Sequence, residues 1–400
     1  MQTPSARALV SRFRRSYHFA ARTLTNVGTK GTLALYDSSV ALDLTFLRRI
    51  RRETGRNVKS ATLARAALAA SAIVAATPPS PVLAQSGEVN VYTYRESKLI
   101  QPLFDAFTKD SSIKVNVISA SSGLEQRIKT EGANSPADVL LTVDIGRIEE
   151  AVRAGITQPI KSDVLDRIVA PQYRDPEGHW YGISVRARVV YASKQRVQQG
   201  AVTYEELADP KWQGKICIRS GQYVYNNALF AAFIAHHGEA KTEEWLKGLK
   251  ANLAQKPSGG DREVARDIAA GKCDIGVANT YYWALMLNND PDKKPWAEAT
   301  KVILSTFQGG GTHVNVSGVV LARYAPNKAN AVKLMEWLVG EQAQHMYADM
   351  NYEYPVRAGI AVNPTIAGYG RLNPDTVPLA KVADQRKAAA NLVDKVGFDN

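Results

Sequence analysis

The hydrophobic pattern after residue 85 predicts strands and helices in alternation. Residues 88–95 alternate between apolar and polar positions, which is the period of a half-buried strand. Residues 98–109 have the spacing of an amphipathic helix. Further strands are predicted at 113–118 and 139–143, each followed by a helix, at 124–131 and 148–154. This order favours an α/β fold with a mainly parallel sheet and helices on its faces.

Two unusually long strand patterns divide the rest of the chain. Residues 183–191 and 313–322 are each long enough to run between two domains, so we expect two lobes joined by a hinge, with a ligand cleft between them. Between these strands the pattern predicts a second α/β lobe. The expected boundaries are 85–186 for the first part of the N-lobe, 187–312 for the C-lobe, and 313–400 for the return strand and completion of the N-lobe.

The positive charge of the chain is concentrated before residue 85. Residues 1–84 contain thirteen Lys and Arg against three Asp and Glu, a net charge of +10, so only +2 of the total +12 remains for residues 85–400. A nearly neutral body does not indicate binding to nucleic acid.

Residues 48–84 have the three parts of an export signal. A basic segment precedes the Ala-rich apolar run 61–76, and Val82-Leu83-Ala84 is a small-residue cleavage pattern. We therefore predict cleavage near Ala84 and export to the periplasm by the general secretory or the twin-arginine route. Residues 1–47 precede a complete signal, which an over-extended start site would explain.

The two cysteines of the chain are Cys217 and Cys273. Export to an oxidising compartment would allow a disulfide between them, and the alternative is two buried thiols. Two cysteines are too few for a Cys-rich zinc or iron–sulfur site.

The most informative stretch is Asn279-Thr280-Tyr281-Tyr282, which follows the apolar run 273–278. Adjacent strand residues point to opposite faces, so the two phenols can converge only where the strand has given way to a helix. Asn279 or Thr280 is a suitable N-cap for a helix over 281–289. The positive end of this helix would favour ionised phenols. The alternative is a buried aromatic pair.

Ionised phenols point to one class of metal. A phenol has a pKa of about 10, so most divalent ions bind it weakly at neutral pH. The small, highly charged Fe³⁺ ion prefers hard oxygen donors and can displace the proton. The sequence has no phosphate loop, nucleophile elbow or zinc-protease motif that would indicate a competing chemistry.

Several segments resemble the periplasmic ferric-iron-binding proteins of ABC importers. They are residues 91–96, 136–144, 186–191 and 279–282, and the resemblance extends from Glu88 to the C-terminus. It implies a periplasmic binding protein fold of two lobes, with Fe³⁺ in the cleft. It also implies a monomer that delivers iron to a permease and its ATPase subunit.

The resemblance implies a ligand set in the second lobe. The metal ligands would be Tyr225, Tyr281 and Tyr282, and Arg186 matches a basic residue near the metal. Many members have a histidine after the first-strand arginine, whereas this chain has Glu96. Some relatives without that histidine use three tyrosines with carbonate or another small anion, and we expect the same arrangement here.

Three further residues complete the predicted site. Arg95 would help Arg186 hold the anion, Tyr94 would either line the cleft or pack in the sheet, and Glu96 would be a further ligand. Two other functions remain open. The same cleft would suit a small organic or oxyanionic solute, and Asp138, Asp144 or Glu96 would serve a secreted hydrolase.

Overall fold

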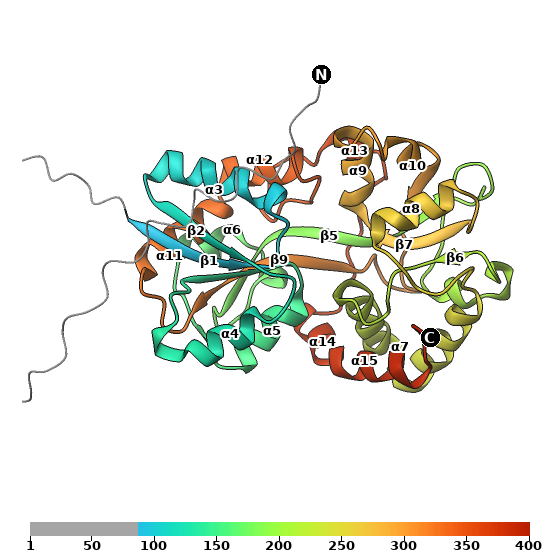
Figure 1. Ribbon diagram of the computed structural model, residues 1–400, viewed down its shortest axis with the longest axis horizontal. Helices are drawn as coiled ribbons and strands as arrows, with labels where there is room; N and C mark the ends of the chain where they lie inside the picture. Colours follow the sequence, from blue (N-terminus) through green and yellow to red (C-terminus); the bar gives the residue numbers. More distant parts are fainter. Residues whose placement is uncertain (1–86) are drawn as a thin grey trace, which may run out of the picture. The chain divides into compact units, whose positions relative to one another are not determined.

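The long strand β5 belongs to two sheet regions and so connects the two halves of the described chain. The computed structural model describes residues 87–400, and the predicted signal and its cleavage site lie outside them. Figure 1 shows the two lobes, with β5 and β9 in the centre. The strands are β1 (Glu88–Thr93), β2 (Lys114–Ser119), β3 (Val139–Thr142), β4 (Thr157–Gln158), β5 (Trp180–Ser193), β6 (Ile216–Cys217), β7 (Ile275–Asn279), β8 (Thr300–Ile303) and β9 (Val314–Ala322).

The strands follow the order β2-β1-β3-β9-β5-β7-β6, with β4 beside β9 and β8 beside β5. Trp180–Ala187 of β5 pairs with β9 in the first lobe, and Arg188–Ser193 pairs with β7 and β8 in the second. The strand predicted at 183–191 therefore does cross between the lobes. The strand predicted at 313–322 does not, because β9 pairs with β3, β4 and β5 in the first-lobe sheet.

The prediction of a mainly parallel sheet is confirmed for β1, β2 and β3, on whose order it rests, but is wrong for the sheet as a whole. Only β1 with β2, β1 with β3, and β6 with β7 are parallel among the named pairings. The pairings of β5 and β9 are all antiparallel, and they outnumber the parallel ones. The α/β class itself is confirmed.

The helices cover both lobes. Those of the first lobe are α3 (Ser97–Ser111), α4 (Leu124–Glu131), α5 (Ile145–Arg153), α6 (Asp163–Ile168), α11 (Lys328–Leu338) and α12 (Glu341–Asp349). Those of the second are α7 (Val224–Ala251), α8 (Asp261–Ala269), α9 (Thr280–Asn289), α10 (Lys294–Glu298), α13 (Pro364–Ala367), α14 (Leu379–Asp384) and α15 (Arg386–Lys395). Gly238, with φ of 79°, kinks α7.

The C-terminal segment departs from the boundary predicted at 313–400. Helices α11 and α12 pack in the first lobe, but α13 contacts α9, and α14 and α15 contact α7 of the second lobe. The chain crosses again near Tyr354, which pairs with Val185 of β5. The last forty residues therefore pack mainly on the second lobe, and α14 also contacts α5 of the first lobe.

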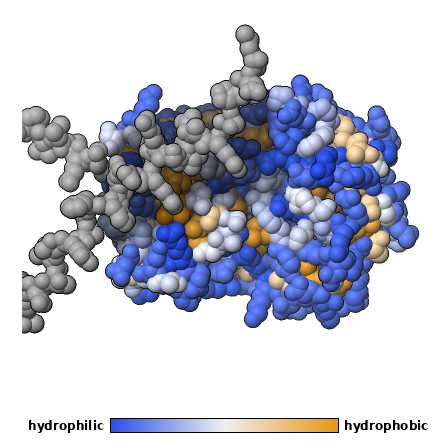
Figure 2. Space-filling model, in the orientation of Figure 1, coloured by the Kyte–Doolittle hydropathy of each residue, from blue (hydrophilic) through white to orange (hydrophobic). Residues whose placement is uncertain are grey.

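Buried side chains form two apolar clusters, and the smaller one fills the second lobe around Phe230, Trp245 and Phe307. The face in Figure 2 is mostly hydrophilic at its edges, with hydrophobic residues toward its middle. Within residues 87–400, no helix is long and apolar enough to cross a bilayer.

Cys217 of β6 and Cys273, just before β7, form a disulfide in the second lobe. Both residues are buried. Of the two alternatives that the sequence left open, the bridge is the one found. It joins the neighbouring strands β6 and β7, and the Asn-Thr-Tyr-Tyr stretch follows directly at the end of β7.

Replacing both cysteines by alanine should destabilise the protein, because the bridge closes a loop with a sequence separation of 56. Chain entropy predicts a loss of about 4 kcal/mol in the free energy of unfolding. Urea denaturation of the oxidised parent and the double variant measures this loss. The reduced parent is the control and should lose a similar amount. A change below about 1 kcal/mol would show that the bridge adds little to stability.

Candidate metal centre

Tyr281 and Tyr282 lie in the first turn of α9, directly after β7. Asn279 keeps an extended backbone (φ −87°, ψ 147°), and the helix begins at Thr280, one residue before the predicted start. The two phenol rings lie side by side, with centroids 4.1 Å apart and planes inclined by 34°. The change from strand to helix thus brings two sequence neighbours to the same side of the backbone.

The third predicted ligand, Tyr225, reaches the same place from another helix. It is the second residue of α7, and its hydroxyl oxygen lies 3.4 Å from that of Tyr281. Tyr225, Tyr281 and Tyr282 are only 5%, 2% and 6% exposed. The N-termini of α7 and α9 therefore bring three buried phenols together, and we call these residues the tyrosine cluster.

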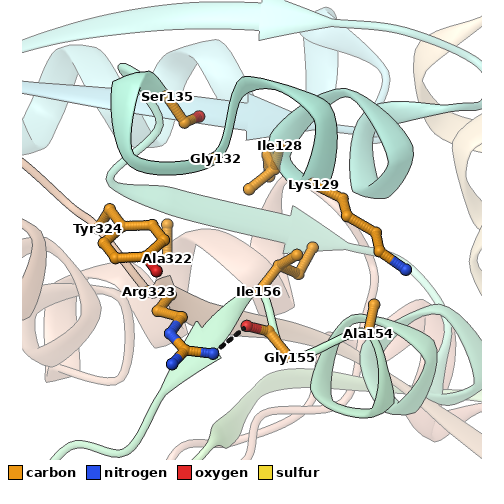
Figure 3. Close-up of a pocket in the computed structure, with 10 residues that line it drawn as sticks. All are labelled: Ile128, Lys129, Gly132, Ser135, Ala154, Gly155, Ile156, Ala322, Arg323 and Tyr324. Carbon is orange, nitrogen blue, oxygen red and sulfur yellow. Dashed lines mark hydrogen bonds between the residues drawn. The ribbon is translucent and has the colours of Figure 1, made fainter.

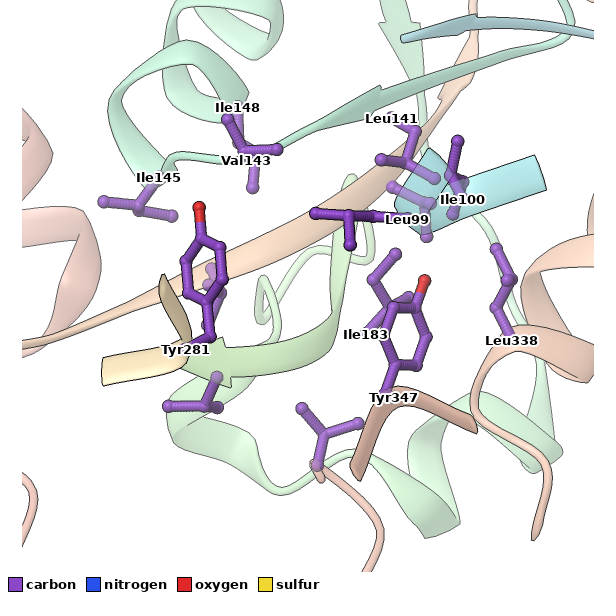
Figure 4. Packing of buried hydrophobic residues seen from close by; sticks show 14 of the residues in the cluster. Leu99, Ile100, Leu141, Val143, Ile145, Ile148, Ile183, Tyr281, Leu338 and Tyr347 are labelled. Carbon is purple, nitrogen blue, oxygen red and sulfur yellow. The ribbon is translucent and has the colours of Figure 1, made fainter. Parts of the chain in front are cut away.

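The tyrosine cluster lies against the first lobe. Tyr281 belongs to the apolar cluster that contains Val143 and Ile145 of the first lobe. In Figure 4 its hydroxyl points toward those two residues, while Tyr347 lies farther along the same core. The lobes are thus in contact around Tyr281, and this phenol is closed off from solvent.

Burial raises the pKa of Tyr281 and of Tyr282 well above the usual value for a phenol, and the nearby Tyr225 raises both further. Arg95 and Arg186 lower the pKa of Tyr281, but not enough to reverse this effect. Loss of solvent therefore opposes the ionisation that the helix N-terminus is expected to favour. At neutral pH both phenols are protonated.

Guanidinium groups surround the tyrosine cluster. The guanidinium carbon of Arg262 lies 4.4 Å from the ring centre of Tyr282, and that of Arg95 lies 5.7 Å from the ring centre of Tyr281. Arg188 and Arg219 lie 5.9 and 5.5 Å from the ring centre of Tyr225. These positive charges are placed to stabilise phenolates if a metal displaces the protons.

The predicted anion-binding residues, Arg95 and Arg186, are held together by a carboxylate that the sequence analysis missed. Glu353 is buried, and its Oε1 lies 2.7 Å from Nη2 of Arg95 and 3.9 Å from Nη1 of Arg186. Its Oε2 accepts a hydrogen bond of 2.5 Å from Ser184. No local motif marks Glu353, which comes from the segment after α12 and is far in sequence from both arginines.

Some guanidinium N–H groups of these two arginines have no hydrogen-bond acceptor within the described residues. Ser317 of β9 accepts hydrogen bonds from Nη2 of Arg186 at 2.8 Å and from Nη1 of Arg95 at 3.4 Å. Within residues 87–400, Nε of Arg95 and both Nε and Nη1 of Arg186 are buried without a hydrogen-bond partner. Unpaired buried donors are costly, so they are suited to receive a small anion.

A second ion-pair network, also missed from sequence, fixes the start of α9. Asp261 accepts a hydrogen bond of 2.8 Å from the backbone N–H of Asn279 and pairs with Arg188 at 2.5 Å and Arg219 at 3.2 Å. Tyr191 of β5 donates to the carbonyl of Asn279 at 2.5 Å. The strand-to-helix junction is therefore held by side chains from β5 and α8.

Glu96 and Tyr94 lie outside the tyrosine cluster. Glu96 pairs with Arg262 of the opposite lobe, at 3.4 and 3.5 Å. The Tyr94 hydroxyl donates to Glu125 and accepts a hydrogen bond of 2.6 Å from the backbone N–H of Leu124. Arg147 lies over its ring, with 3.9 Å from guanidinium carbon to ring centre. Tyr94 thus joins the sheet to α4.

The carboxylates considered for a hydrolase have structural partners. Asp138 accepts hydrogen bonds from the backbone N–H groups of Asn90 and Asn327. Asp144 caps α5 by accepting from the N–H of Arg147, and it accepts another hydrogen bond from Asn315. In the part of the chain that the structure describes, no group of three or more His, Cys, Asp and Glu side chains is placed to hold a metal.

A cavity of about 200 Å³ lies in the first lobe, apart from the tyrosine cluster (Figure 3). Apolar side chains such as Ile128 and Ile156 form its walls, with Lys129, Arg323 and Tyr324 beside them. None of the predicted site residues lines it, so this cavity is separate from the candidate metal centre.

Comparison with known proteins identifies the family. Residues 134–372 match the family model of the bacterial extracellular solute-binding proteins. The chain belongs to this family. The relatives of this solute-binding protein include iron uptake protein A1 of Synechocystis, which is 42% identical over 80% of this chain and 91% of the relative.

Solved structures give the same result for this solute-binding protein. The Bordetella ferric binding protein is 56% identical, with a TM-score of 0.73, over 78% of this chain and all of that one. A Trichodesmium protein in complex with iron and citrate is 41% identical, with the same TM-score and coverage. The resemblance that the sequence motifs predicted is confirmed.

Replacing Glu353 by Gln should destabilise the protein, because the buried guanidinium groups of Arg95 and Arg186 would lose their carboxylate. Breaking a buried ion pair from one side costs about 3–5 kcal/mol. Urea denaturation of the metal-free protein measures the loss. Glu341→Gln, at the exposed start of α12, is the control and should behave as the parent. Equal urea midpoints for the parent and Glu353→Gln would show that the carboxylate of Glu353 does not stabilise the protein.

Proposed function

We propose that this protein binds ferric iron in the cleft between its lobes, through the phenolate oxygens of Tyr225, Tyr281 and Tyr282. The observation that carries the proposal is the meeting of three buried phenols from two helix N-termini, with guanidinium groups around them. Three hard oxygen donors that lose protons on binding suit Fe³⁺ better than divalent ions.

A small anion completes the coordination in this proposal. The guanidiniums around the cluster are Arg95, Arg186, Arg188, Arg219 and Arg262, and their carboxylate partners are Glu96, Asp261 and Glu353. Five positive and three negative charges leave a net charge of +2. Three phenolates neutralise Fe³⁺, so a dianion such as carbonate would balance the buried site.

The free donors of Arg95 and Arg186 support a position for that anion. They are buried beside Tyr281 and have no partner within the described residues. A bidentate carbonate could accept hydrogen bonds from them while it fills coordination positions that three phenolates leave open.

The relatives support ferric iron as the ligand. Their names include iron uptake protein A1 and ferric binding protein, and one solved relative contains iron and citrate. A Serratia marcescens relative, 28% identical over 85% of this chain, is named an Fe(3+)-binding periplasmic protein.

The cellular role follows from the same proposal. The protein is exported by its N-terminal signal, captures iron in the periplasm as a monomer, and delivers it to an ABC permease with its ATPase subunit. Closure of two lobes on the ion would give the permease a conformation to recognise. The role is binding and not catalysis, which the structural partners of Asp138 and Asp144 favour.

The second candidate is a small organic or oxyanionic solute in the same cleft. The observation that favours it is the protonated state of Tyr281 and Tyr282, since neutral phenols are hydrogen-bond donors to such a ligand. It predicts a colourless ligand that is retained without iron.

Replacing Tyr281 and Tyr282 by Phe should abolish iron binding, because only one of the three phenolate ligands would remain. Titration of the parent with ferric citrate should produce a red-orange charge-transfer band that the double variant lacks. Tyr324→Phe, on an exposed first-lobe residue, is the control and should give the parent spectrum. A folded parent without the band would exclude ferric iron and leave the organic solute. A charge-transfer band in the double variant would exclude Tyr281 and Tyr282 as iron ligands.

Iron affinity should fall steeply as the pH is lowered. The raised pKa values of Tyr281 and Tyr282 mean that both protons must leave when iron binds, so two protons compete with each ion. The affinity should drop at least roughly a hundredfold per pH unit below neutrality. Competition with a chelator of known proton stoichiometry measures the slope. Tyr281→Phe should reduce it by about one proton, and a pH-independent affinity would contradict the proposal.

A further inference from the structure

The ion pair between Glu96 and Arg262 joins the two lobes beside the tyrosine cluster. Glu96 precedes α3 of the first lobe, and Arg262 is the second residue of α8 in the second lobe. Nη1 and Nη2 of Arg262 face Oε1 and Oε2 of Glu96 at 3.5 and 3.4 Å. The guanidinium is therefore already arranged for a two-pronged contact with a carboxylate.

This pair is looser and more exposed than the others around the cluster. Its distances exceed the 2.7 Å of Arg95 with Glu353 and the 2.5 Å of Arg188 with Asp261. The side chains of Arg262 and Glu96 are 21% and 39% exposed, whereas Arg95, Arg188 and their partners are nearly fully buried. An exposed pair at long distance adds little stability, so it is easily replaced.

Glu96 also has an alternative partner on its own lobe. The ammonium of Lys98 lies 3.7 Å from its Oε2. If another carboxylate takes Arg262, Glu96 keeps a nearby positive charge and remains accessible to water. Displacing it from Arg262 therefore leaves no buried, uncompensated charge.

Arg262 is positioned to contact a ligand of the metal. Its guanidinium carbon lies 4.4 Å from the ring centre of Tyr282, one of the proposed iron ligands. A carboxylate held by Arg262 would thus lie beside the ring of Tyr282. The buried donors of Arg95 and Arg186 are placed beside Tyr281 instead, and they are enclosed.

We propose that Arg262 is a specificity-determining residue that binds a carboxylate of a polycarboxylate iron chelate. In the absence of the chelate, Glu96 pairs with Arg262, and the chelate displaces it. This inference rests on the proposed ferric function and deepens it. The cleft then has two anion positions. The enclosed position at Arg95 and Arg186 takes a small anion, and the accessible one at Arg262 takes an arm of the chelate that brings the iron.

Retention of radiolabelled citrate tests the assignment. The full-length protein is loaded either with ferric citrate or with ferrous sulfate oxidised by air in bicarbonate buffer, then desalted. Iron is measured by the charge-transfer band and citrate by its label. The variants are Arg262→Lys, which keeps the charge near Tyr282 but loses the planar fork, and Glu96→Gln, which weakens the internal competitor.

In the parent, citrate should remain bound together with iron. Arg262→Lys should weaken citrate retention at least about tenfold, while the band formed with bicarbonate falls far less. Glu96→Gln should retain citrate more tightly than the parent. Arg266→Gln is the control, because Arg266 lies one turn along α8 and pairs with Asp267 outside the cluster.

The outcomes separate this inference from the proposed function. Citrate retention by Arg262→Lys equal to that of the parent would overturn the role of Arg262. Weaker retention by Glu96→Gln would overturn its role as a displaceable competitor. Iron loading of the parent by both routes without any retained citrate would overturn the chelate position alone. Absence of the band by both routes would instead overturn the ferric function itself.

Discussion

The tyrosine cluster depends on buried positive charge. Tyr281 and Tyr282 lie against each other in an apolar interior and resist ionisation, because each phenolate would lose its water and repel its neighbour. The raised pKa values of Tyr281 and Tyr282 express this cost. In the proposed function, the surrounding guanidiniums would stabilise a metal-bound, ionised cluster, and Glu353 and Asp261 hold the buried guanidiniums of Arg95 and Arg188 in place.

The topology explains how these charges reach one point. Strand β5 carries Arg186 in its first-lobe half and Arg188 in its second-lobe half, on the same face. Arg186 therefore meets Ser317 and Glu353, while Arg188 meets Asp261 at the start of α8. A single strand that belongs to both sheets thus places one positive charge in each lobe. The short disulfide-linked strand pair β6 and β7 supports the side that carries the phenols.

Local sequence features could predict part of this arrangement. Alternation and helical spacing located most elements of the first lobe, and the strand-to-helix argument placed Tyr281 and Tyr282 on a common side. Glu353, Asp261 and Arg262 could not be found in this way, because their roles come from contacts between segments far apart in sequence. The C-terminal helices were also misplaced. Their amphipathic pattern shows that they pack on a surface, but not which lobe provides it.

Burial of the phenols also bears on how iron would leave. In the closed arrangement Tyr281 lies against first-lobe residues, and water has little access to it. Opening the lobes would hydrate the cluster and separate Arg95 and Arg186 from it, since both belong to the first lobe with Glu353 nearby. Phenolates would then lose two of the five guanidiniums around them, those of Arg95 and Arg186, while protons regain access. In the proposed function, the electrostatic support of the iron site would therefore be divided across the hinge, so that opening would weaken it.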